Sequence, residues 1–162
     1  IPPCNRTHAN LSTICSRRGK SMSDKKVTGG CLCGAVRFEI ELPTLFCGHC
    51  HCSMCRQPHG SAFVTWTAVP PERFRYLAGE EQTRQFQSSE EGTRTFCHLC
   101  GSQMLCQIEP DILDIALSAL HAPIDRVPEA HWYYDSRVTW FEVTDDLPKY
   151  GGESGMEPLG ID

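Results

Sequence analysis

The sequence predicts a single small domain built mainly of antiparallel β-strands. Segments of period-two alternation recur along the chain, helical periodicity is nearly absent, and Gly, Pro and Ser separate the segments. The 162 residues fit one domain, and a hydrophobic fraction of 40% provides enough apolar surface for a core. Many short strands between turn residues are typical of an all-β architecture.

The first predicted strand runs from Val36 to Leu42, where apolar side chains alternate with charged ones until Pro43 ends the run. The further predicted strands are Ala62–Val69, Arg73–Leu77, Thr83–Gln87, Arg94–Phe96, Gln103–Ile108, Ile112–Leu117 and Val138–Val143. One short helical turn is expected around Asp125–Ala130. Phe63, Trp66 and Trp140 are expected to lie in the core.

Residues 1–21 differ from the rest of the chain. They carry four basic residues and no acid, and they have no amphipathic or alternating pattern. The segment that begins at Met22 reads like a natural start. We therefore predict that residues 1–21 are a flexible or non-native extension and that residues 22–162 form one domain.

Charge and hydropathy exclude two classes of protein. The formal net charge of −5 argues against a general nucleic-acid binder, because such proteins collect Lys and Arg to neutralise phosphates. No apolar stretch approaches the roughly 20 residues that a membrane-spanning helix needs, so we expect no membrane insertion. Eleven cysteines, an odd number, fit a disulfide framework poorly.

The cysteines occur in short-spaced pairs, which let two thiolates turn onto one metal ion. The pairs are Cys31/Cys33, Cys47/Cys50, Cys52/Cys55 and Cys97/Cys100. Disulfides within such pairs would be strained, whereas zinc accepts this spacing. The cysteines therefore indicate metal ligands in a reducing compartment, and we expect the protein in the cytoplasm.

Two of these pairs resemble each other, because each is followed directly by a glycine, Gly34 or Gly101. A glycine there permits the positive φ that a tight thiolate turn needs. We call each cysteine pair with its following glycine a knuckle. If the two knuckles bind one ion, they form a closed four-thiolate zinc site that stabilises the fold. Its ligands are Cys31, Cys33, Cys97 and Cys100.

The second cluster lacks the trailing glycine and contains Cys47, Cys50, Cys52 and Cys55, interleaved with histidines. Cys47 either closes a second tetrahedron or is a free thiol nearby. Farther along the chain, Cys106 is expected to be a small buried hydrophobe.

With these cysteine clusters, the sequence resembles the glutathione-dependent formaldehyde-activating enzyme family, also called the centromere protein V domain family. The resemblance covers roughly residues 27–150 and includes the order and spacing of all seven family cysteines. The matching segments are Gly29–Arg37, Cys50–Arg56 with Gly60–Phe63, Phe96–Ser102, Leu117–Leu120 and Trp140–Glu142 with Leu147–Pro148.

The resemblance implies a small antiparallel β-sheet domain of the Mss4-like type, held together by two zinc ions. The second zinc, proposed as catalytic in the family, would take Cys50, Cys52 and Cys55 and keep a fourth position for water or a substrate thiolate. The associated activity is carbon–sulfur lyase or synthase chemistry, the reversible joining of glutathione and formaldehyde to S-hydroxymethylglutathione.

Three residues after the second cluster are candidates for contacts with glutathione. Arg56 and Gln57 could contact a substrate carboxylate, and His59 could act as a general acid or base. His131 is expected to serve packing or hydrogen bonding. Two other classes stay open: a non-catalytic, zinc-stabilised binding or scaffold module, and a secreted domain linked by disulfides.

Overall fold

The computed structural model describes residues 25–159, so the extension predicted for residues 1–21 and the boundary at residue 22 lie outside the described part. Strands dominate, and no helix within residues 25–159 is long and apolar enough to cross a membrane. The strands are β1 (Lys26–Gly30), β2 (Arg37–Glu41), β3 (Cys47–Cys50), β4 (Val64–Val69), β5 (Phe74–Ala78), β6 (Thr83–Gln87), β7 (Thr93–Cys97), β8 (Gln103–Gln107), β9 (Leu113–Ala116), β10 (His131–Trp132), β11 (Tyr150–Gly151) and β12 (Glu157–Pro158). The helices are α1 (Ser53–His59) and the 3₁₀ turns Pro71–Arg73, Glu80–Gln82, Leu117–Ala119 and Tyr134–Ser136.

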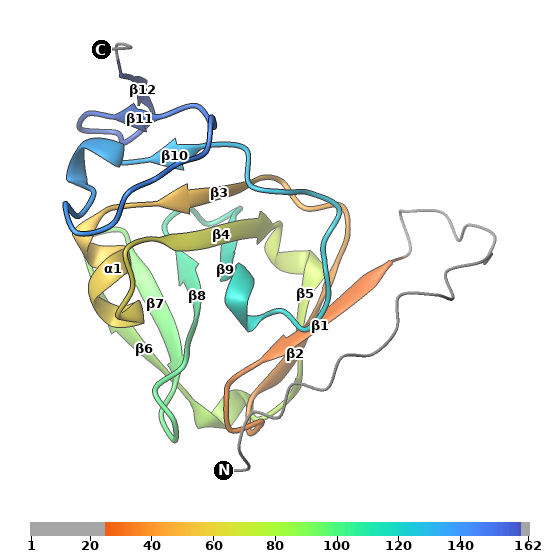
Figure 1. Ribbon diagram of the computed structural model, residues 1–162. Helices are drawn as coiled ribbons and strands as arrows, with labels where there is room; N and C mark the ends of the chain where they lie inside the picture. Colours follow the sequence, from red (N-terminus) through yellow and green to blue (C-terminus); the bar gives the residue numbers. More distant parts are fainter. Residues whose placement is uncertain (1–24, 160–162) are drawn as a thin grey trace, which may run out of the picture.

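The strands form three sheets (Figure 1). The largest has seven strands in the order β10-β3-β4-β9-β8-β7-β6, a second has the order β1-β2-β5, and β11 pairs with β12. Neighbouring strands are antiparallel, except that the two-residue β10 runs parallel to β3. The prediction of a mainly β, antiparallel domain is therefore confirmed, with one parallel pair at the edge of the large sheet.

The core lies between the two larger sheets. On β2, Phe38 and Ile40 are fully buried while the flanking charged residues are exposed or half-buried. They belong to one cluster with Met104 of β8 and Ile115 of β9. Each of these side chains contributes on the order of 1.5–3 kcal/mol of burial free energy, so the two sheets stabilise each other through a shared core.

Seven predicted strands are confirmed, each within two residues at either end. They correspond to β2, β4, β5, β6, β7, β8 and β9. The prediction that Trp66 lies in the core is also confirmed, since it is buried on β4, and Phe63 is half-buried.

Two predicted elements are wrong. Val138–Val143 is a turn and loop, and Trp140 is 72% exposed, because the segment has no neighbouring strand within the described residues to bury its apolar side chains. Asp125–Ala130 is irregular and not helical. There the Asp125 carboxylate accepts hydrogen bonds from the Thr44 N–H and hydroxyl, which anchor the segment without a helical turn.

The sequence analysis also missed α1, which begins directly after Cys52 and ends at Gly60. Only Cys55 is buried among its seven residues, so the helix leaves no apolar periodicity in the sequence. Gly60 adopts the left-handed conformation, with φ of 58°, and its N–H caps the last turn. This short helix contains Cys55 of the second cysteine cluster and the three candidate substrate residues.

Candidate metal centres

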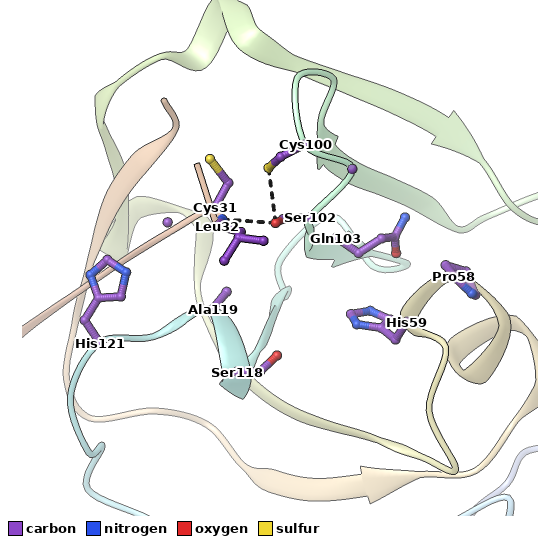
Figure 2. Close-up of a pocket in the computed structure, with 12 residues that line it drawn as sticks. Cys31, Leu32, Pro58, His59, Cys100, Ser102, Gln103, Ser118, Ala119 and His121 are labelled. Atoms are coloured by element: carbon purple, nitrogen blue, oxygen red, sulfur yellow. Dashed lines mark hydrogen bonds between the residues drawn. The ribbon is translucent and has the colours of Figure 1, made fainter. Parts of the chain in front are cut away.

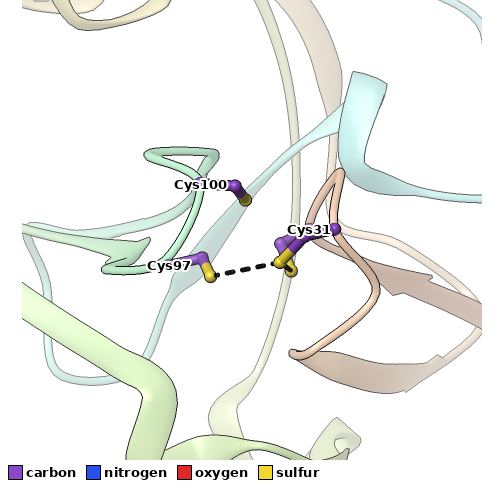
Figure 3. A group of neighbouring side chains, drawn as sticks. Cys31, Cys97 and Cys100 are labelled. Atoms are coloured by element: carbon purple, nitrogen blue, oxygen red, sulfur yellow. Dashed lines mark hydrogen bonds between the residues drawn. The ribbon is translucent and has the colours of Figure 1, made fainter. Parts of the chain in front are cut away.

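The four-cysteine cluster joins two knuckles that are far apart in the sequence (Figure 3). The four Sγ atoms all lie within 4.8 Å of one another. The Sγ atoms of Cys31 and Cys33 are 3.4 Å apart, and those of Cys33 and Cys97 are 3.9 Å apart. Zn–S bonds of about 2.3 Å in a tetrahedron place sulfur atoms about 3.8 Å apart, so the donor set fits a zinc ion.

Backbone geometry shapes both knuckles as the sequence predicted. Gly34 and Gly101 have φ angles of 77° and 74°, the left-handed region that glycine enters without strain. The Val36 N–H points at the Cys31 sulfur at 3.2 Å, and the Gly101 N–H donates to the Cys97 carbonyl at 2.8 Å. These turns place the four sulfur atoms close together.

The second cluster contains three cysteines, around the start of α1. Cys50 ends β3, Cys52 precedes the first residue of α1, and Cys55 lies in its first turn. Their Sγ atoms all lie within 4.8 Å of one another, with 3.5 Å between Cys50 and Cys52. Cys50 and Cys55 are buried, and Cys52 is half-buried. Three thiol ligands so placed fit a metal ion that keeps one further coordination position.

Cys47 does not belong to this cluster. It lies three residues before Cys50 on β3, and side chains alternate across a strand, so the two sulfur atoms point to opposite faces. Burial raises the pKa of the Cys47 thiol to about 11, as it does for Cys106, which is buried on β8 as predicted. Both residues are therefore buried thiols outside the two cysteine clusters.

Arg94 is a feature of the site that the sequence analysis did not identify. It is only 4% exposed on β7, and its Nη2 atom lies 3.7 Å from the Cys55 sulfur. Nε donates to the Ser88 hydroxyl at 3.2 Å, and Arg94 has no ion pair with a carboxylate among the described residues. A buried guanidinium is costly without an anion, and a Cys55 thiolate supplies one.

A chain of buried histidines begins at His51, within the three-cysteine segment. The Nε2 atom of His51 lies 2.8 Å from Nδ1 of His131, whose Nε2 atom lies 3.0 Å from the Asp145 carboxylate. Both histidines are 1% exposed, and His51 sits between two of the cysteines in sequence. The expectation that His131 serves hydrogen bonding is confirmed, and the chain fixes the backbone that carries Cys50 and Cys52.

The three candidate substrate residues do not share one cavity. Arg56 donates to the carbonyls of His51 at 2.8 Å and Ser136 at 3.2 Å, so its guanidinium ties α1 to the chain after β10. Gln57 is exposed and lines a groove beside α1. Successive helix residues point in different directions, which is why neighbours in sequence separate here.

His59 lines a cavity of about 540 Å³ between α1 and the four-cysteine cluster, together with Cys31 and Cys100 (Figure 2). Its ring meets Trp66 edge-on at 5.5 Å, and its Nε2 atom is buried without a hydrogen-bond partner. Burial lowers the pKa of His59, so the ring is neutral near pH 7 and can accept a proton.

The chain is a β-rich domain with two cysteine clusters that could hold metal ions. A family model described as "Glutathione-dependent formaldehyde-activating enzyme" matches residues 26–136, and the chain belongs to that family. A Halomonas elongata protein named "Putative glutathione-dependent formaldehyde-activating enzyme" is 27% identical over 124 residues, which are 71% of this chain and 79% of that protein. A Rhodobacter sphaeroides protein of known crystal structure shares the fold, with a TM-score of 0.53 and 24% identity over 62% of this chain and 97% of that one.

Proposed function

We propose that the protein binds two zinc ions and catalyses the reversible addition of glutathione to formaldehyde. The observation that carries the proposal is the preformed three-cysteine cluster beside a buried arginine, within a chain of this family. The four-cysteine cluster would hold a closed structural ion, and Cys50, Cys52 and Cys55 would hold an ion with one open position. The name of the Halomonas elongata relative supports the same substrates.

In the proposed reaction a glutathione thiolate attacks the formaldehyde carbon. One carbon–sulfur bond forms, the π electrons of the carbonyl move to oxygen, and that oxygen takes the proton that the thiol has lost. A zinc ion at the open site would keep the substrate sulfur as a thiolate at neutral pH. The reverse reaction cleaves the carbon–sulfur bond and returns thiol and aldehyde.

The protein's own residues supply charge balance and proton transfer in this scheme. Arg94 offsets the single net negative charge that three thiolates and a divalent ion leave at the cluster. His59, neutral and with a buried Nε2 atom that has no hydrogen-bond partner, is the proposed acceptor of the thiol proton. Arg56 acts indirectly, because its bonds to two carbonyls position α1.

Exchange NMR on glutathione and formaldehyde tests the proposal. Zinc-loaded protein should accelerate interconversion with S-hydroxymethylglutathione, and Cys52→Ala should lose that acceleration together with one zinc ion per chain. Cys47→Ala is the matched control, since Cys47 is a buried cysteine outside both clusters. If the zinc-loaded protein leaves the interconversion rate unchanged, the enzymatic proposal is wrong and a binding or scaffold role becomes the better description.

A further inference from the structure

A groove of about 570 Å³ lies between α1 and the strands β6, β7 and β8, and no ligand has been assigned to it above. Met54, Gln57 and Pro58 of the helix form one wall, and Gln85 and Phe86 of β6 lie on the other. The volume falls within the range of small-molecule sites. Arg94 is the one buried residue among those that line the groove, so it forms the floor.

The groove has a positive floor without a complete set of partners. No acidic residue lines it, and Arg94 is its one charged lining residue. After the bonds to Ser88 and Cys55 are counted, Nη1 of Arg94 is buried and still has no hydrogen-bond partner. A buried donor left unpaired costs about 1–3 kcal/mol, which an anionic ligand at the floor would recover.

Gln103, which lines both this groove and the cavity beside His59, also has a polar atom without a partner. The Oε1 atom of Gln103 on β8 is buried without a hydrogen bond. Figure 2 shows the Gln103 side chain reaching from β8 toward Pro58 of α1. An amide oxygen is an acceptor, and a ligand with an N–H or O–H donor would satisfy it.

Apolar side chains complete the walls of the groove. Phe86 is 61% exposed and Met54 is 48% exposed, although both are large and hydrophobic. Methylene groups of a ligand would cover them and gain burial free energy. The groove therefore suits a small molecule that combines an anionic group, a peptide-like N–H group and a short aliphatic segment.

We propose that this groove binds the acidic, peptide-like part of the thiol substrate, with Arg94 as its cation and Gln103 as its hydrogen-bond acceptor. Glutathione, the substrate of the proposed function on which this inference rests, has two carboxylates, two peptide N–H groups and a methylene chain. Arg94 also contacts Cys55, so a ligand seated on its guanidinium lies next to the three-cysteine cluster. The groove thus selects the thiol, while the cluster holds its sulfur.

Calorimetric titration with S-methylglutathione tests the groove apart from catalysis, because this probe keeps the carboxylates and peptide bonds but has no free thiol. The zinc-loaded protein should bind it. The diethyl ester of the same probe, which lacks both carboxylates, should bind about tenfold or more weakly, since a charged hydrogen bond contributes about 1.5–3 kcal/mol. Equal binding of acid and ester would overturn the proposal, as would no binding of the acid.

Matched variants locate the site. Gln103→Leu should weaken binding about fivefold, whereas Gln107→Leu, on the same strand but outside the groove, should not change it. Phe86→Ala removes an exposed wall residue and should also weaken binding. Binding that both variants leave unchanged would place the ligand elsewhere. S-methylglutathione binding without catalysis would refute only the enzymatic proposal, and catalysis without groove binding would refute only this one.

Discussion

Two ionisable groups of opposite type lie in one row of the large sheet, with Arg94 buried and Asp114 half-buried. Arg94 pairs with Cys106 in the strand register, and Cys106 pairs with Asp114, so the three residues lie side by side across β7, β8 and β9. Arg94 and Asp114 make no ion pair. Arg94 instead turns to Cys55, while burial raises the pKa of the Asp114 carboxyl to about 7. The row thus has a cation that contacts the cluster and a carboxyl whose pKa lies near neutral pH.

Replacing Arg94 should weaken metal binding at the three-cysteine cluster. Arg94→Gln removes the charge that offsets three thiolates, so the affinity for zinc should fall about tenfold, in line with about 1.5–3 kcal/mol for a charged hydrogen bond. Arg94→Lys should retain part of the affinity. Competition with a chromogenic chelator measures this, with Arg75→Gln on the exposed face of β5 as control. An unchanged affinity in Arg94→Gln would refute this role.

The Asp114 carboxyl predicts a pH dependence of stability. Its pKa is raised in the folded state, so the folded state binds the proton more tightly and the unfolding free energy falls as pH rises from about 4 to about 7. Between pH 6 and 8.5 the zinc-loaded protein should lose about 1 kcal/mol relative to Asp114→Asn. Urea unfolding of both proteins at the two pH values measures the difference. Parallel pH profiles would mean that Asp114 does not titrate in this range.

Strand β1 depends on a close approach that only glycine permits. A Cβ at Gly29 would lie 2.5 Å from the Phe38 ring and 2.6 Å from the Ala119 carbonyl oxygen. Gly29→Ala should therefore destabilise the protein by about 2–3 kcal/mol, the cost of overpacking against a rigid neighbour. Gly60→Ala at the end of α1 meets open space and should cost only about 1–2 kcal/mol for its positive φ. Equal losses in thermal unfolding would contradict the steric explanation.

Local pattern was enough to predict the strands of the core but not the elements around the second cluster. Val36–Leu42 alternates because one face of β2 is buried, and that period is visible in the sequence. β1 and β3 carry glycines and cysteines, which have no such period, and α1 has a single buried residue. Their conformation follows from pairing with distant strands and from the turn at Gly60, which single-sequence patterns do not contain.

The cysteine spacing predicted the four-cysteine group, because knuckle geometry is local, but it left the place of Cys47 in the second cluster open. The set Cys50, Cys52 and Cys55 came from the family resemblance. Neither Arg94 nor the His51–His131–Asp145 chain could be found in the same way. The residues of that chain are 80 and 14 positions apart and meet only through the fold. The sequence did hold one signal for Arg94, which shares a face of a predicted strand with Phe96. A charged residue on an apolar strand face indicates a buried cation that needs a partner.

The two clusters should differ in what they do for the whole molecule, because they close very different lengths of chain. Cys33 and Cys97 bring together segments 64 residues apart, whereas Cys50, Cys52 and Cys55 lie within one turn region. A structural zinc site that spans the fold contributes on the order of 10 kcal/mol of apparent folding free energy. Cys97→Ala should therefore abolish cooperative unfolding of the zinc-loaded protein. Cys52→Ala should lose one zinc ion and keep a cooperative transition a few degrees lower.

Differential scanning calorimetry together with zinc content per chain distinguishes these outcomes, and Cys47→Ala controls for loss of a buried cysteine outside both clusters. Similar melting temperatures for Cys97→Ala and Cys52→Ala would contradict the division between a structural and a functional cluster. That result would mean that the shared core between the two sheets holds the fold without the four-cysteine site. The cysteines of the two knuckles would then be available to bind a ligand in the cavity that Cys31 and Cys100 line beside His59.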